Sequence, residues 1–167
     1  MEGYLKIFSK EYGTAEYKAE IPGLIQLDKI SDSLTILKIY FQDLITISEE
    51  EYTWPEHGAE VMLANYAVEI STLDELDGKT IVLKEGFTPD ILFAMLSVWD
   101  GQSLNNNKIM FTKIAEGCFR VFWTGYFGDG KQEDDVELEM IAYQTNDLVT
   151  PLCDHTEELI EYYTNRI

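Results

Sequence analysis

The acidic stretch at residues 127–140, FGDGKQEDDVELEM, holds the densest group of side chains that could do chemistry in this sequence, with six carboxylates against one lysine. Carboxylate oxygens bind calcium, and an EF-hand loop needs an oxygen ligand at its third position, Gly at its sixth and Glu at its twelfth. Counted from Asp129, these places hold Lys131, Asp134 and Met140. The EF-hand motif is therefore excluded, although a weaker cation site through Asp129 with Asp134 or Asp135 stays open.

Catalysis by these or other side chains is not indicated. A carboxyl group that acts as a general acid needs a pKa raised by burial, whereas this pattern places the carboxylates in a polar turn or on the outward face of a strand. Cys118 and His57 could form a nucleophile and base only if the fold brings them together. A core cysteine and a loop histidine are the simpler interpretation. We predict a protein that is not an enzyme and that has no cofactor and no metal.

Charge limits the choice of partner. The chain of 167 residues has 31 acidic and 12 basic side chains, a formal net charge of -19. A protein that binds the phosphate backbone needs clustered Lys and Arg, so direct binding of nucleic acid is not expected. Cys118 and Cys153 have no CxxC or Cys/His spacing, and the sequence shows neither a signal peptide nor a membrane-spanning apolar run. We predict a cytoplasmic protein that does not bind a membrane.

Aromatic residues flank the carboxylates at two places. An aromatic anchor ringed by negative charge suits a basic protein partner, and the alternative is a pair of solvated loops. The predicted partner-binding residues are Tyr126, Phe127, Asp129, Glu133, Asp134, Asp135, Glu137 and Glu139 in one cluster, and Glu49, Glu50, Glu51, Tyr52 and Trp54 in the other.

Alternation of apolar and polar residues predicts three antiparallel strands near residues 108–114, 118–127 and 136–143. The first two form a hairpin with a bulged turn that ends at Gly117, and residues 128–135 connect the second strand to the third. In the third strand the apolar residues point inward and Glu137 and Glu139 point outward.

Elsewhere the sequence predicts two or more strands between residues 33 and 48, and strands at 61–70 and 79–86 with a turn at 76–78. Residues 88–99 suit a helix or a central strand equally well. A helix is expected after Pro151, with Leu152, Leu159, Ile160 and Tyr163 on one stripe. The expected fold class is therefore α+β, a mostly antiparallel β-sheet with a C-terminal helix packed on it, in a single domain over residues 1–167.

Residues 105–143 resemble bacterial immunity proteins that accompany polymorphic toxins and contact-dependent inhibition toxins. The matching pattern is a strand that begins Asn-Lys-Ile, a strand that ends Trp-Thr-Gly, an acidic loop and an alternating Glu-rich strand. The resemblance implies a protein that binds a toxin domain and blocks it, and it assigns no functional residue.

The leading hypothesis is a non-catalytic acidic immunity protein that binds and neutralises a cognate protein toxin, which is expected to be basic. One alternative is a DNA mimic that occupies a nucleic-acid-binding enzyme. The nearly balanced charge of residues 61–114 supports that alternative only in part. Another alternative is a small-ligand-binding or hydrolase domain built around Cys118 or His57.

Overall fold

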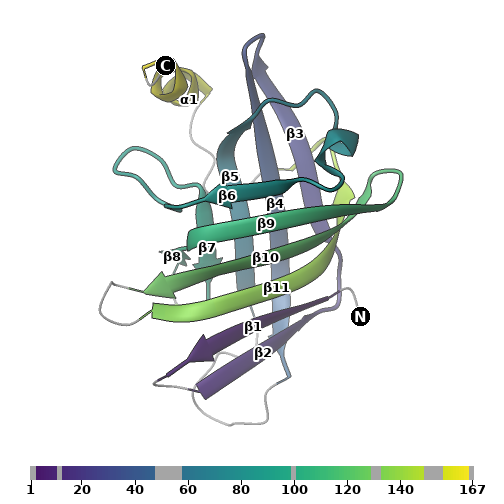
Figure 1. Cartoon of the computed structure of the whole chain (residues 1–167), viewed down its shortest axis with the longest axis vertical. Helices are drawn as coiled ribbons and strands as arrows, with labels where there is room; N and C mark the ends of the chain where they lie inside the picture. The colour runs from purple at the N-terminus through teal and green to yellow at the C-terminus, as the bar shows by residue number, and fades with distance from the viewer. Residues whose placement is uncertain are drawn as a thin grey trace.

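The protein is a mostly β structure with one C-terminal helix (Figure 1). A computed structural model describes residues 3–10, 13–47, 58–98, 101–128, 133–148 and 156–165. The elements are β1 (Gly3–Ser9), β2 (Gly13–Ala19), β3 (Gly23–Ser31), β4 (Leu34–Thr46), β5 (Ala59–Val68), the 3₁₀ helix η1 (Leu73–Leu76), β6 (Thr80–Leu83), β7 (Ala94–Ser97), β8 (Gly101–Ser103), β9 (Asn105–Ala115), β10 (Cys118–Gly128), β11 (Glu133–Gln144) and α1 (Thr156–Thr164).

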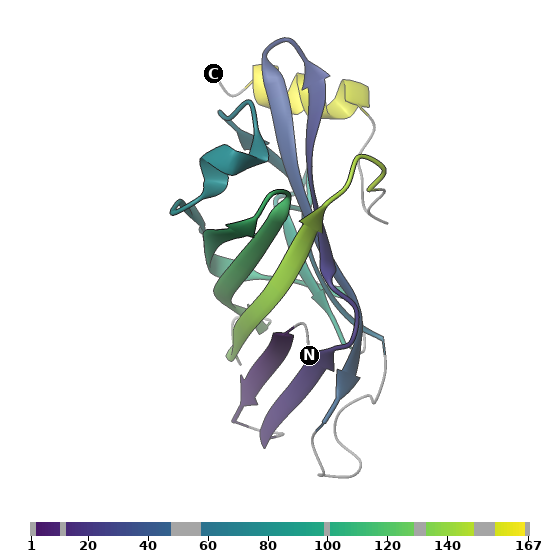
Figure 2. The same cartoon turned by 90° about the vertical axis from the view of Figure 1, so that its right-hand side faces the viewer.

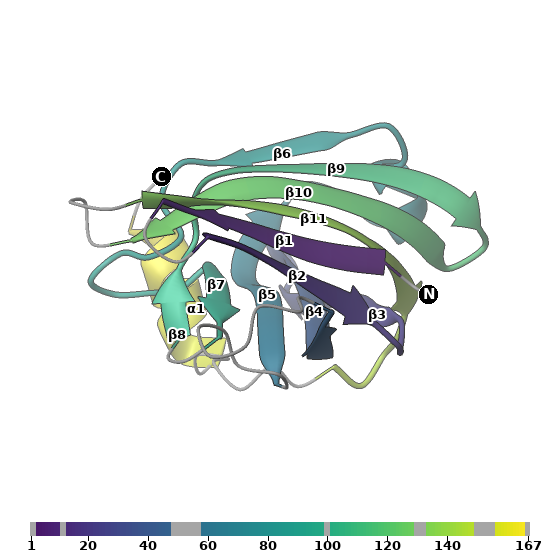
Figure 3. The ribbon, with the colours of Figure 1, turned by 90° about the horizontal axis from the view of Figure 1, so that it is seen from below.

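The strands form one hydrogen-bonded sheet that folds over on itself. Its order is β6-β9-β10-β11-β1-β2-β4-β5-β7-β8, and β3 pairs with both β11 and β4. Because of this double pairing, β11, β1, β2, β4 and β3 close into a small five-stranded barrel, and the remaining strands extend it on either side. We call β6, β9, β10, β11, β1 and β2 the front sheet, which arches over β4, β5 and β7 (Figure 3).

The main core fills the space between these two layers. Its largest fully buried side chains include Trp123, Phe111 and Phe119 from the front sheet and Phe41 and Ile39 from β4. Those from the front sheet sit on the inward face of alternating strands, which is the arrangement expected when one face of an antiparallel sheet is solvated. Strand β4 is instead buried on both faces from Ile36 to Phe41, because apolar clusters also form on its other face. The three predicted strands of the front sheet are confirmed, with a register shift next to Gly117 at the β9–β10 turn.

One upstream prediction is wrong. In the segment at 33–48, the described residues 33–47 contain a single strand, β4, rather than two or more. Asp43 has a φ of 54°, and the ladder between β4 and β5 shifts register between Phe41 and Leu44. The chain therefore bends at a bulge within one strand, and β4 pairs with β3 before the bend and with β2 after it.

In the ambiguous segment at 88–99, the described residues 88–98 form a turn and then a strand. The backbone N–H of Ile91 donates to Thr88 Oγ1 at 3.2 Å, and that of Thr88 donates to the Ile91 carbonyl at 2.9 Å. Thr88 as a cap and Pro89 at a first helical position could begin a helix, but here they form only a local turn. β7 follows and pairs with β5, because the apolar run is buried between neighbouring strands.

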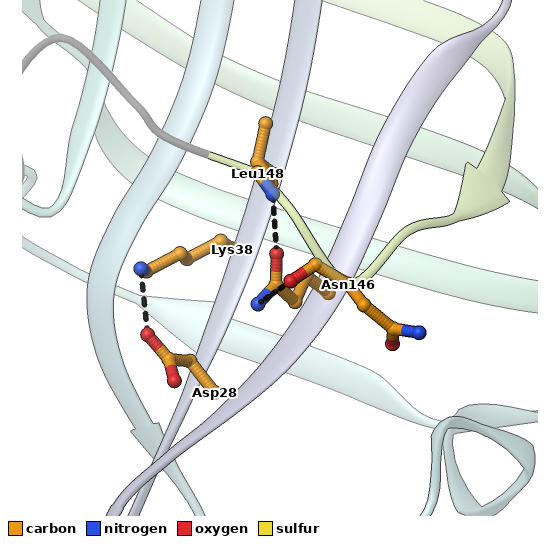
Figure 4. Close-up of polar contacts among 5 residues, drawn as sticks. Asp28, Lys38, Asn146 and Leu148 are labelled. Carbon is orange, nitrogen blue, oxygen red and sulfur yellow. Dashed lines mark hydrogen bonds and ion pairs between the residues drawn. The ribbon is translucent and has the colours of Figure 1, made fainter.

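The described C-terminal residues, 145–148 and 156–165, cover the face of β3, β4 and β5 that points away from the front sheet. Residues 145–148 lie at one end of this face, where buried Gln26 accepts from the Leu148 N–H at 2.7 Å and donates to the Asn146 carbonyl at 3.3 Å (Figure 4). Beside Gln26 on this face, Lys38 is buried and its Nζ lies 2.8 Å from Asp28 Oδ2. These polar groups separate two small apolar clusters on this face.

Helix α1 covers the other end of this face, near the tip of the β3–β4 hairpin (Figure 2). Leu159 is buried against Leu34, Ile36 and Phe93, whereas Ile160 is 37% exposed. The predicted apolar stripe is therefore confirmed at Leu159 and wrong at Ile160, and Leu152 lies outside the described residues. No helix in the described ranges is long and apolar enough to cross a membrane.

Candidate functional site

The front sheet brings four of the predicted partner-binding residues together on its solvent side. Tyr126 of β10 pairs with Asp135 of β11, and Glu137 and Glu139 follow at alternate positions of β11. All four side chains are half-buried or exposed, because the residues between them point into the core. One aromatic and three acidic groups of the predicted set therefore lie on one surface of the sheet.

Strand β1 completes the surface, because it lies beside β11. Tyr4, Lys6 and Phe8 pair with Glu139, Glu137 and Asp135, respectively. The N-terminal sequence GYLKIFS alternates in the same way as the predicted strands, so the signal for a strand was present. Its position beside β11 follows only from tertiary pairing. We define the outer face as Tyr4, Lys6, Phe8, Phe122, Thr124, Tyr126, Asp135, Glu137 and Glu139.

Two predicted residues are not on the outer face, which corrects the sequence interpretation. Phe127 is 6% exposed and Asp134 is 8% exposed, and the two pair across β10 and β11. The predicted connection at 128–135 is shorter than expected, because β11 begins at Glu133 and the alternation of that strand turns Asp134 inward. A partner that docks on the outer face cannot contact either side chain.

Other predicted positions are outside the described ranges. Asp129, the second cluster (Glu49, Glu50, Glu51, Tyr52 and Trp54) and His57 lie in segments that the structure does not describe. Glu133 contributes backbone to β11, but its side chain is not described. Cys118 is a buried free cysteine at the start of β10. A thiol so enclosed is a poor candidate for a nucleophile that must reach a substrate.

Charges of both signs alternate across the outer face. In the strand register, Lys6 lies opposite Glu137 of β11 on one side and opposite Glu16 of β2 on the other. Arg120 Nε lies 3.7 Å from Glu139 Oε1. The Lys6 ammonium is 4.8 Å from the centre of the Tyr4 ring. The outer face is therefore electrostatically patterned rather than uniformly negative. Such a pattern selects a partner with a complementary arrangement of charge.

A hydrogen bond fixes one carboxylate of this pattern. The Tyr4 hydroxyl donates to Glu137 Oε1 at 2.8 Å. The pKa of Tyr4 is raised to about 12. Burial makes the largest contribution, and the hydrogen bond to Glu137 and the negative charge of that residue add to it. Tyr4 therefore remains a neutral donor throughout the physiological range, and its hydrogen bond holds Glu137 in one orientation.

The described residues contain no group of three or more His, Cys, Asp or Glu side chains placed to hold a metal ion. What the outer face can do is present aromatic rings beside ordered charges, which is the chemistry of a protein-binding surface. Comparison with protein-family models, with curated proteins and with solved structures gives no match.

Proposed function

We propose that this chain is a non-catalytic immunity protein that binds a cognate basic toxin through the outer face and neutralises it. The proposal is carried by one observation, that four aromatic and three acidic side chains lie together on one sheet surface. They are Tyr4, Phe8, Phe122 and Tyr126 with Asp135, Glu137 and Glu139. Rigid aromatic groups supply affinity, and the carboxylates supply complementary charge.

The net charge of the whole chain supports the same partner. A charge of -19 attracts a basic protein from beyond contact distance and raises its association rate, in a manner that weakens with added salt. The basic side chains of Lys6 and Arg120 among these carboxylates argue against a DNA mimic at this surface, because a mimic of the phosphate backbone needs a run of like charges. Burial of Cys118 similarly weakens the hydrolase alternative.

The test begins with the product of the neighbouring gene, because immunity genes are expected beside toxin genes. That product is purified and its binding to this protein is measured by calorimetry, and the two are then co-expressed in a growth assay. The proposal predicts a stable complex and rescue of growth. It is abandoned if no neighbouring gene encodes a toxic product, or if the product neither binds nor is neutralised.

Variants then locate the surface. Tyr126→Ala and Glu137→Lys remove an anchor and reverse a charge on the outer face. Glu116→Lys is the matched control, because it makes the same charge change at an exposed turn between β9 and β10. We expect the outer-face variants to weaken binding by at least roughly thirtyfold, which corresponds to the loss of about 2 kcal/mol that marks an interface hot spot. Equal losses in the control would show that only net charge matters.

A further inference from the structure

A hollow of about 560 Å³ beside helix α1 has four aromatic side chains in its wall, Tyr66, Phe93, Tyr162 and Tyr163. The sheet region contributes the first two rings and α1 contributes the other two. Its remaining lining consists of Ala67, Leu83, Lys84, Glu85 and Thr88. We call this hollow the aromatic groove. It lies at the helix end of the molecule and shares no residue with the outer face.

Contacts already present hold the aromatic groove in shape. The Tyr163 hydroxyl donates to the Asn65 carbonyl and accepts from the Ala67 N–H at 3.0 Å. Asn65 has a φ of 59° and is fully buried in β5, where the ladder with β4 shifts register. The rings of Tyr162 and Tyr163 meet nearly edge to face, with centroids 5.1 Å apart. A ligand therefore meets a preorganised wall, which lowers the entropic cost of binding.

The lining of the groove carries one charge of each sign, Lys84 and Glu85, and further carboxylates lie on the segments that form it. The described segments 84–91 and 156–165 carry Glu85, Asp90, Glu157, Glu158 and Glu161 against Lys84. A second hollow on the other flank of α1 shares Tyr162 with the groove and is lined by Asp90, Glu158 and Glu161. The aromatic wall thus lies within a field that favours a cationic occupant over a neutral or anionic one.

We propose that the aromatic groove binds an arginine side chain presented by a protein partner. A guanidinium is planar, stacks on aromatic rings and pairs with carboxylates through several N–H groups. Glu85 is an exposed carboxylate in the lining that can accept those donors, and its charge offsets that of Lys84 beside it. This assignment goes beyond the proposed function, because it holds for any arginine-bearing partner and does not require a toxin.

The experiment uses the full chain and two short peptides of equal charge, acetyl-Gly-Arg-Gly-Arg-Gly-amide and its lysine counterpart. Titrations followed by amide resonances report both affinity and location. We expect the arginine peptide to shift the resonances of Tyr66, Ala67 and Tyr163 and to bind more tightly than the lysine peptide. Tyr162→Leu should weaken its binding roughly fivefold, the factor that an ordinary cation–π contact provides.

Glu85→Gln gives a second reading if Tyr162→Leu disturbs the packing of α1. Glu116→Gln is its control, because it removes the same charge from the distant β9–β10 turn. A larger loss of affinity in Glu85→Gln than in Glu116→Gln supports the groove. Equal losses, equal binding of the two peptides or shifts confined to other surfaces would each overturn the proposal. The growth and calorimetry tests of toxin binding are independent of every one of these results.

Discussion

Replacing Asn107 with Ala should destabilise the fold strongly, because this one buried amide satisfies three other polar groups. Asn107 is 1% exposed. Its Oδ1 accepts from the Trp123 indole N–H at 2.8 Å, and its Nδ2 donates to the carbonyls of Leu104 at 2.7 Å and Leu83 at 3.2 Å. The amide therefore ties β9 to β10, to the residue before β9 and to the end of β6.

The magnitude follows from the groups left behind. A buried donor or acceptor that loses its partner costs about 1–3 kcal/mol. The indole N–H of Trp123, which is 1% exposed, has no access to bulk water, and the two carbonyls each lose one bond. We expect a total loss of about 3–5 kcal/mol in the free energy of unfolding. For a chain of this size that lowers the melting temperature by roughly 10 °C.

The assay is urea unfolding followed by far-ultraviolet circular dichroism, with the m-value checked for constancy. Asn146→Ala is the control, since it makes the same change at an exposed side chain and should alter stability by less than about 0.5 kcal/mol. Asn107→Asp keeps an acceptor for Trp123 but replaces the amide donor with a carboxylate facing two carbonyls, so it should also be strongly destabilised at neutral pH. A loss below about 1 kcal/mol in Asn107→Ala would refute the reasoning.

Three further predictions concern other parts of the fold. Asp28→Asn should lower the free energy of unfolding by about 2 kcal/mol in urea, because Lys38 stays buried while its carboxylate partner loses its charge. Lys38→Met should lower it by less, and a larger loss in Lys38→Met than in Asp28→Asn would contradict this account. Tyr163→Phe should speed hydrogen exchange in α1 while leaving the front sheet protected, since it removes the two bonds to β5; unchanged exchange in α1 would show that the helix does not depend on them. Burial raises the folded-state pKa values of Tyr4, Tyr17 and Tyr40 to about 12, above their ordinary value of 10.0. Their contribution to stability is therefore complete below pH 10 and is lost as the pH rises toward 12. Ultraviolet titration of the folded protein should show delayed ionisation of these three side chains, and ordinary titration of all tyrosines would contradict the prediction.

Local pattern was enough to predict the strands of the front sheet. The period of two in residues 108–114, 118–127 and 136–143 predicted β9, β10 and β11, because a strand with one buried face must alternate. The same pattern put Glu137 and Glu139 on the solvent side. It failed at Asp134, where the boundary of β11 decided which way the side chain points, and boundaries depend on pairing with a neighbour.

Pairing between distant segments was beyond the reach of the sequence. The contact between β1 and β11 joins residues more than 120 positions apart, as the Tyr4–Glu137 hydrogen bond illustrates. A single sequence indicates the pairing of strands that a short turn joins, such as β9 and β10, but not which distant strands become neighbours. Closure of the barrel by β3 and the bend at Asp43 depend on the same long-range packing.

By itself, the sequence determined the charge of the protein, the inward and outward faces of the strands of the front sheet and the presence of a C-terminal helix. Only the tertiary structure decided which charges lie beside which aromatic rings. It placed Tyr4 and Lys6 next to Glu137, and it brought Tyr162 and Tyr163 of α1 against β5 and Phe93. The physical reason is that residue type and spacing fix local conformation. A surface made of several strands depends instead on packing between segments that lie far apart in the sequence.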